Sequence, residues 1–177
     1  MRRLIAILPV AAFVLVLLGF MVGLRRDPAI LPSMLIGKPL PAFNLPPLKT
    51  SEPGLASADL TGEPMLLNVF ASWCGPCREE QPTLLQMKSE GVKIVGLDWK
   101  EEAAAGARWL DENGDPYLRT GNDSTGRAGI DLGVSGVPET FVVDRRGRVR
   151  YRQVGAITPD VWVQTIAPLM AKLRAES

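Results

Sequence analysis

Both cysteines of the chain lie in one four-residue unit, Cys74-Gly75-Pro76-Cys77, between an apolar run and a segment of good helix formers. Three chemistries compete for such a pair. A structural disulfide this short would close a very small loop and contribute little chain entropy. A zinc site would need two more ligands, which no other Cys or His of this chain can supply. A redox dithiol fits best, because a Cys at a helix N-terminus faces unpaired N–H groups that stabilise its thiolate.

The rest of the composition narrows the possible chemistry further. The chain has 177 residues and no histidine, which removes imidazole bases, Ser-His and Cys-His nucleophile pairs, and His ligands for zinc or haem. Two cysteines allow at most one intramolecular disulfide, so the chain is not a disulfide-stapled scaffold. Its core must therefore come from buried apolar residues.

The pattern around the cysteines predicts the elements that hold them. Residues 65–71 and 92–97 are apolar runs typical of strands buried on both faces, and residues 78–90 and 101–113 favour helices. Residues 138–144 and 148–154 indicate a hairpin, and Thr158-Pro159-Asp160 starts a last helix that Pro168 should kink or break. This order predicts an α/β sheet with helices on both faces.

The N-terminal segment differs from the rest of the chain because it is continuously uncharged and apolar. Leu4 to Leu24 is an uncharged run of 21 residues, about 31 Å of helix, which is long enough to cross a bilayer core. We expect a membrane anchor over residues 1–26 and a linker over 27–36; a cleaved signal peptide and a buried core helix are the alternatives. The arginines on both sides of the span give only a small bias toward a cytoplasmic N-terminus.

Charge argues against one class of partner. Without the four arginines that flank the span, 16 basic residues face 19 acidic ones, so the rest of the chain carries a net charge of −3. A mildly acidic domain lacks the basic footprint of a nucleic-acid-binding protein.

Three segments carry a family resemblance: GKPLPAFNLPPL (37–48), NVFASWCGPCREEQP (68–82) and GVPETFVVD (136–144). They resemble the membrane-anchored periplasmic CcmG/DsbE group of thioredoxin-like proteins, with its ResA-like relatives, which serves cytochrome c maturation. The resemblance covers about residues 35–174. It implies a thioredoxin-like α/β fold over 37–174 with a tail at 175–177. Because Pro138 comes 61 positions after Cys77, it also implies a central insertion of a strand and a helix around residues 98–132.

The resemblance assigns roles to the motif residues. Cys74 would be the exposed nucleophile, and Cys77 would resolve the mixed disulfide. The Val137–Pro138 peptide bond would be cis and would present backbone groups to a substrate strand beside the dithiol.

Three further residues have two interpretations each. Glu80 falls where ResA-like proteins carry a Glu near the dithiol, and a partly buried carboxyl there could relay a proton to Cys77; a solvated acid is the alternative. Ordinary thioredoxins have an Asp where this chain has Asn68, which makes Glu80 the better candidate. Glu139 either lines the substrate groove or only starts a strand, and Trp73 either packs beside the disulfide or belongs to the core.

The predicted hairpin also carries a group of arginines. Five arginines of the hairpin are expected on its solvated face or against an anionic membrane surface: Arg145, Arg146, Arg148, Arg150 and Arg152. The chain is expected to need no cofactor or metal. We expect an inner-membrane, single-pass protein with its C-terminal domain in the periplasm.

The expected activity is selective disulfide reduction. Its client would be apocytochrome c or a thiol-carrying maturation partner, and the resemblance implies a membrane electron donor of the DsbD or CcdA type. A general dithiol oxidant is the alternative within the same chemistry. A membrane-tethered, chaperone-like binding module with an incidental Cys pair is the alternative from another class.

Overall fold

The computed structural model describes residues 9, 12–21 and 34–176, and it divides the chain into two units, 1–31 and 32–177. In the first unit Pro9 and residues 12–21 are helical. Across the described part of the chain, no helix combines the length and the apolar character that a membrane crossing requires. The expected span, 4–24, includes residues outside the described ranges, so the anchor stays a prediction. Most of the expected linker and residue 177 also lie outside these ranges.

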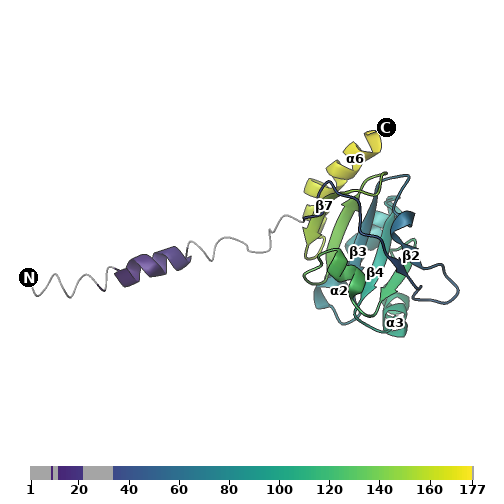
Figure 1. Cartoon of the computed structure of the whole chain (residues 1–177), viewed down its shortest axis with the longest axis horizontal. Helices are drawn as coiled ribbons and strands as arrows, with labels where there is room; N and C mark the ends of the chain where they lie inside the picture. The colour runs from purple at the N-terminus through teal and green to yellow at the C-terminus, as the bar shows by residue number, and fades with distance from the viewer. Residues whose placement is uncertain (1–8, 10–11, 22–33, 177) are drawn as a thin grey trace, which may run out of the picture. The chain divides into compact units, whose positions relative to one another are not determined.

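A five-stranded sheet forms the centre of the second unit (Figure 1). The strands lie in the order β5-β4-β3-β6-β7; β3, β4 and β5 are parallel, whereas β6 runs antiparallel to β3 and to β7. Their bounds are β3 Met65–Phe70, β4 Ile94–Trp99, β5 Thr120–Asp123, β6 Glu139–Val143 and β7 Val149–Val154. The apolar run predicted as a doubly buried strand is thus the central one, and every residue of β3 is buried.

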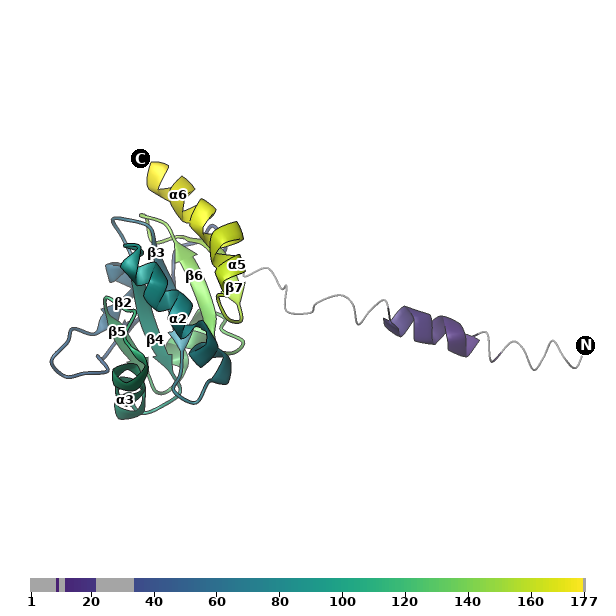
Figure 2. The ribbon, with the colours of Figure 1, turned by 180° about the vertical axis from the view of Figure 1, so that it is seen from behind.

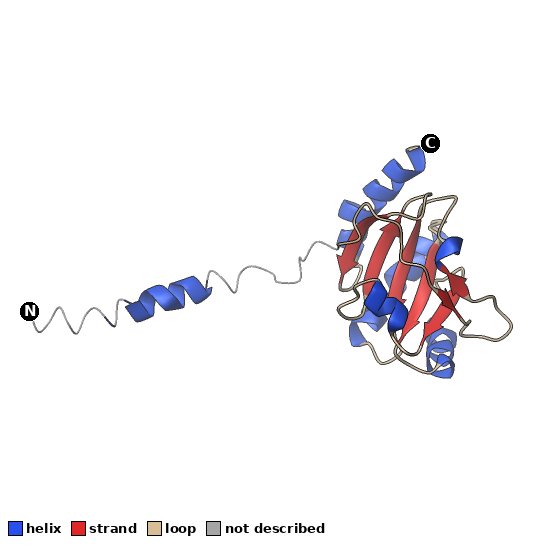
Figure 3. Ribbon diagram, viewed as in Figure 1, coloured by secondary structure: helices blue, strands red, loops and turns tan. Residues whose placement is uncertain are grey.

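Helices lie on both faces of this sheet, as predicted (Figures 2 and 3). The helices are α2 Gly75–Ser89, α3 Ala103–Asn113, α4 Arg127–Asp131, α5 Pro159–Val161, the π-helical turn η2 Trp162–Ile166 and α6 Ala167–Ala175. Two short strands, β1 Asn44–Leu45 and β2 Leu55–Ala56, pair in a separate small sheet, and β2 is followed by the 3-10 turn η1 Ser57–Asp59. Residues 98–132, where an inserted strand and helix are expected, contain α3, β5 and α4.

Some boundaries differ from the prediction. The helix after the cysteines begins at Gly75 rather than Arg78, because Cys74 already acts as its N-cap. The second strand runs from 94 to 99 rather than from 92 to 97. The irregularity expected at Pro168 is present one turn earlier, as a π-helical turn in which the Ala167 N–H donates to the carbonyl of Trp162.

The alternation of β3 divides the core in two. Leu66 and Phe70 pack with α2, α3 and the C-terminal helix, whereas Met65, Leu67 and Val69 pack on the other face with α4. Asn68 belongs to the same face as Leu66 and Phe70 by this alternation. It is a fully buried polar residue among apolar ones, and it lies under the N-terminal part of α2.

Candidate active site

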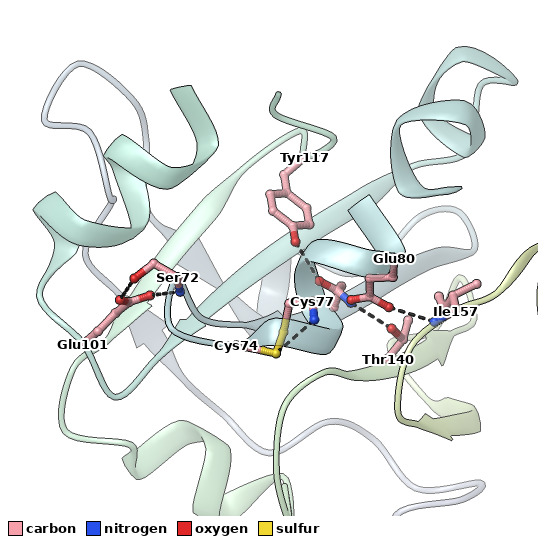
Figure 4. The surroundings of a disulfide bond; sticks show 9 residues. Ser72, Cys74, Cys77, Glu80, Glu101, Tyr117, Thr140 and Ile157 are labelled. Atoms are coloured by element: carbon pink, nitrogen blue, oxygen red, sulfur yellow. Dashed lines mark hydrogen bonds between the residues drawn. A yellow bond between two sulfur atoms is a disulfide. The ribbon is translucent and has the colours of Figure 1, made fainter. Parts of the chain in front are cut away.

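Cys74 and Cys77 form a disulfide at the N-terminus of α2, with their Cα atoms 5.3 Å apart (Figure 4). Cys74 has extended backbone geometry as N-cap residue, and its Sγ accepts a hydrogen bond from the Cys77 N–H at 3.1 Å. Pro76 lies in the first turn, where its missing N–H costs no helical hydrogen bond. The helix N-terminus therefore directs backbone N–H groups at the sulfur that would carry thiolate charge.

Exposure distinguishes the residues of this motif. Cys74 is 4% exposed and Cys77 is 1% exposed, so in the disulfide form both are buried and the exposure expected of Cys74 is not present. Trp73 is 58% exposed, so the interpretation of this residue as part of the core is wrong. An exposed indole directly before Cys74 is available for contact with another molecule.

Glu80 is buried on α2, three residues after Cys77 (Figure 4). Its Oε1 accepts from the Asn68 side-chain amide at 3.0 Å, and its Oε2 accepts from the Ile157 N–H at 2.8 Å. Burial raises the pKa of Glu80 from 4.5 to about 7, while these two hydrogen bonds act in the opposite direction. The alternative of a solvated acid is therefore wrong for Glu80, whereas the neighbouring Glu79 is exposed as expected.

Asn68 connects Glu80 to residues that the sequence did not single out. Its side-chain amide also donates to Thr140 Oγ1 at 3.0 Å, and its Oδ1 accepts from the Tyr117 hydroxyl at 2.7 Å. Tyr117 stacks on Phe70, with ring centroids 4.9 Å apart. Burial, and next the Glu80 carboxyl, raise the pKa of Tyr117 well above its ordinary value of 10.0, so this hydroxyl remains a donor at neutral pH. The only sequence signal for these hydrogen bonds was Asn68 itself, a polar residue inside an apolar strand.

A second acidic group lies on the other side of the disulfide (Figure 4). The backbone N–H and hydroxyl of Ser72, two residues before Cys74, both donate to the Glu101 carboxylate. Glu101 also shares a hydrogen bond with Asp98, which is fully buried. Burial, and then the hydrogen bond with Glu101, raise the pKa of Asp98 to about 9, so one proton stays on this pair at neutral pH.

The loop before β6 carries the other predicted residues. The Val137–Pro138 peptide bond is cis, as expected; Pro138 is buried, and Val137 is half-buried between the two core clusters. Glu139 is fully buried. Its Oε1 accepts from the N–H and the hydroxyl of Ser135, at 2.8 and 2.6 Å, so its carboxylate holds the loop that leads to Pro138.

Arg152 completes this loop site, and its predicted place on the solvated face is wrong. Its Nε donates to Glu139 Oε2 and its Nη2 to Oε1, each at 2.8 Å, and its side chain is only 10% exposed. The strand register explains the difference. Glu139 pairs with Val154 and Phe141 with Arg152, so the Arg152 side chain crosses diagonally toward Glu139 on the same face.

The geometry suits thiol–disulfide exchange. A cysteine pair lies at a helix N-terminus and is already bonded, an exposed Trp73 precedes it, and a carboxyl that titrates near neutrality lies three residues after Cys77. Glu80 accepts hydrogen bonds from Asn68 and from the Ile157 N–H, and Glu101 accepts from Ser72, all of them neutral donors. Such a site can exchange two electrons and can supply or accept a proton without histidine.

Comparison with known proteins agrees with this chemistry. The Redoxin family model matches residues 35–166. The thiol:disulfide interchange protein DsbE of Pseudomonas aeruginosa is 43% identical over 176 residues, which cover 99% of this chain and 98% of that protein. The protein of the same name from Escherichia coli K12 is 39% identical over 183 residues, covering 100% and 99%.

Solved structures show the same architecture. A structure from Chlorobium tepidum that carries the DsbE name superposes with a TM-score of 0.66 at 29% identity and covers 75% of this chain and 95% of that one. A secreted disulfide oxidoreductase of Mycobacterium tuberculosis, with a TM-score of 0.61 at 21% identity, covers 74% and 96% and supports the fold alone.

Proposed function

The chain belongs to the Redoxin family and, within it, to the DsbE thiol:disulfide interchange proteins, and on that premise we propose that it reduces disulfides selectively in the periplasm. Its clients would be apocytochrome c or a thiol-carrying partner of cytochrome c maturation. The observation that carries the proposal is the Cys74–Cys77 disulfide at the N-terminus of α2 with the buried Glu80 three residues after Cys77 on the same helix. The N-terminal segment would anchor the protein in the inner membrane.

The reaction starts from the reduced dithiol. The Cys74 thiolate attacks one sulfur of the client disulfide; the S–S bond of the client breaks, its other sulfur leaves as a thiolate, and a mixed disulfide forms. Cys77 then loses its proton and attacks the Cys74 sulfur. This step releases the second client thiolate and produces the Cys74–Cys77 disulfide. The client gains two electrons, and this protein loses two.

Glu80 would accept the Cys77 proton. With a pKa of about 7 it exists in both protonation states near neutral pH, which suits a group that takes a proton in one half-reaction and returns it in the other. Trp73, Val137 and Pro138 would form the surface that receives the client strand. Glu139, being fully buried, would act as a positioning residue for that loop and not as a client contact.

The oxidised product must be reduced again. In an oxidising compartment the electrons would come from a membrane donor of the DsbD or CcdA type, by the same exchange run in reverse. A general dithiol oxidant would use the same residues in the opposite direction. The reduction potential distinguishes a reductant from an oxidant: thioredoxin-type reductants have potentials of about −270 mV and the strongest oxidants about −120 mV.

The deciding experiment is a mixed-disulfide trap in cells. Cys77→Ala should accumulate proteins linked to Cys74, and identification of cytochrome-maturation components would support the proposal. A broad range of secreted clients would favour the oxidant. The Cys74→Ser, Cys77→Ala double variant is the matched control, and full function in Cys74→Ser would favour the binding module.

Glu80 has its own test. In reduced Glu80→Gln protein, the pH profile of thiol alkylation should shift relative to the unsubstituted protein, while the circular dichroism stays unchanged. Glu79→Gln, one residue away and exposed, is the control. An alkylation profile identical to that of the unsubstituted protein would eliminate the proton-transfer role.

A further inference from the structure

The turn between β6 and β7 and the start of β7 carry four arginines, Arg145, Arg146, Arg148 and Arg150, which we call the basic hairpin face. Hydrogen bonds to Asp144 fix the backbone of the turn. Asp144 Oδ1 accepts from the N–H groups of Arg146 and Arg148 at 2.9 and 3.1 Å, and the Gly147 N–H donates to the Asp144 carbonyl at 2.9 Å. The arginines are therefore displayed from a defined backbone.

The charge of this face is only partly neutralised. Arg150 pairs with Asp144 and with Glu176 of the segment after α6, at 3.2 and 2.9 Å. Arg145, Arg146 and Arg148 are exposed, and within the described residues they form no ion pair. The basic hairpin face lines a cavity of about 330 Å³ together with Gly37, Leu173 and those two acids, so four cations there face two anions. The excess is notable in a domain whose net charge is negative.

The chain enters the domain at this same face. The Gly37 N–H donates to the Val149 carbonyl at 2.7 Å, the Val149 N–H donates to the Lys38 carbonyl at 3.0 Å, and the Arg148 guanidinium donates to the Gly37 carbonyl at 3.0 Å. Lys38 is exposed and adds a further cation. Gly37 and Lys38 are thus attached to the hairpin that carries the arginines.

The number of residues between the expected anchor and the domain limits how far this face can lie from a lipid surface. Eight residues separate Arg26, the last of the expected anchor, from Leu35, which packs against the core. Even fully extended, they span only about 30 Å. A domain tethered so briefly through Gly37 and Lys38 has the basic hairpin face within reach of the headgroups.

We propose that the basic hairpin face, together with Lys38, docks on anionic phospholipid headgroups of the membrane that holds the anchor. The proposal rests on the membrane attachment in the proposed function. Guanidinium groups suit this occupant, because each can donate two parallel hydrogen bonds to a phosphodiester.

Docking would orient the dithiol. Met65 at the start of β3 pairs with Val143, next to the hairpin turn, whereas Val69 near the end of β3 pairs with Glu139. Cys74 follows the end of β3, so the dithiol and the hairpin turn lie at opposite ends of the sheet. A domain docked through the turn would hold Trp73 and the disulfide away from the bilayer, facing soluble clients.

The test uses the full oxidised chain in lipid nanodiscs that contain gadolinium-chelating lipids. Paramagnetic broadening of backbone amide signals measures the distance to the lipid surface. In discs with about 30% phosphatidylglycerol, residues 38 and 145–149 should broaden strongly and the Trp73 indole should not. In purely zwitterionic discs, or at high salt, the broadening at the hairpin should weaken.

Two charge-matched variants complete the design. Arg145→Gln, Arg146→Gln, Arg148→Gln should lose the difference between lipids, because each cation near such a surface changes the docking equilibrium roughly fivefold. The control, Lys100→Gln, Arg108→Gln, Arg127→Gln, removes three exposed cations from other parts of the domain and should keep the difference between lipids. Equal broadening in both lipids, or loss in both variants, would overturn the proposal. Failure of the chain to enter discs of either lipid would instead contradict the anchor.

Discussion

Glu80 and Glu139 are both buried glutamates, yet the protein gives them different partners. Glu80 receives hydrogen bonds from two neutral donors, and among the described residues no Lys or Arg forms an ion pair with it. Glu139 has a bidentate ion pair with Arg152 in addition to the hydrogen bonds from Ser135. Burial without a cation moves a carboxyl such as that of Glu80 toward neutrality, whereas the Glu139 carboxyl has a guanidinium in contact with both of its oxygens.

This difference distinguishes Glu80, which can transfer a proton, from Glu139, which stabilises the structure. A carboxyl with a pKa of about 7 changes its state under small changes of surroundings, which is what exchange at Cys77 would require. Glu139 is instead ion-paired with Arg152 and binds the loop before Pro138, which suits a structural role. The following substitutions test this contrast, and each alters one side of it.

Arg152→Met should have the largest effect. It leaves the Glu139 carboxylate buried without its cation, which typically costs about 3–5 kcal/mol of unfolding free energy. Urea denaturation at neutral pH would measure this. The double variant Arg152→Met, Glu139→Gln removes the charge as well and should recover much of the loss. A single variant as stable as the unsubstituted protein would mean that the two glutamates do not differ in this way.

Glu80→Gln should change how stability depends on pH. Because the folded-state pKa of Glu80 lies above its ordinary value, the folded protein holds the extra proton between pH 4.5 and about 7. The free energy of unfolding therefore falls as pH rises through that window, by about 3 kcal/mol in total. Glu80→Gln should remove this decline.

Denaturation of the oxidised protein at several pH values between 4.5 and 8 would show it. The raised pKa of Asp98 adds a decline of the same sign that extends to about pH 9, and this part should persist in the Glu80 variant. A decline below pH 7 that is as steep in Glu80→Gln as in the unsubstituted protein would contradict the assignment.

Tyr117→Phe should have a smaller effect. It removes the donor to Asn68 Oδ1 and leaves a buried acceptor unpaired, at a cost of about 1–2 kcal/mol. The hydrogen bonds of Glu80 remain, so its pH-dependent decline in stability should also remain. Thermal or urea unfolding at two pH values measures both quantities. Loss of the decline would show that Tyr117, rather than burial, controls Glu80.

Ser135→Ala should have the smallest effect. The Ser135 hydroxyl is one of several donors to Glu139, and Arg152 and the Ser135 N–H remain in its absence. We expect a loss of about 1 kcal/mol or less, measured by urea denaturation. A loss as large as that of Arg152→Met would show that the loop, and not the ion pair, determines the stability of the Glu139 site.

Predictions from the sequence succeeded where the controlling interactions are local. The doubly buried strand, the hairpin and the helix that starts at the cysteines follow from apolar periodicity and from capping within a few residues. Boundaries were less accurate: α2 begins at Gly75, three residues before the expected start, because Cys74 caps it, and β4 begins two residues late. Arg152 was misplaced, because its partner lies 13 residues away and on the neighbouring strand.

The sequence by itself determined the dithiol, its position at a helix N-terminus and the position of Glu80 on the helix face of Cys77, because residues three apart on a helix must share a face. Only the tertiary structure decided the state of that carboxyl. Its partners Asn68 and Ile157 are 12 and 77 residues away, and Tyr117, which donates to Asn68, is 49 residues from it. A pKa depends on how much water and which charges surround a group, and those surroundings exist only after distant segments have packed together.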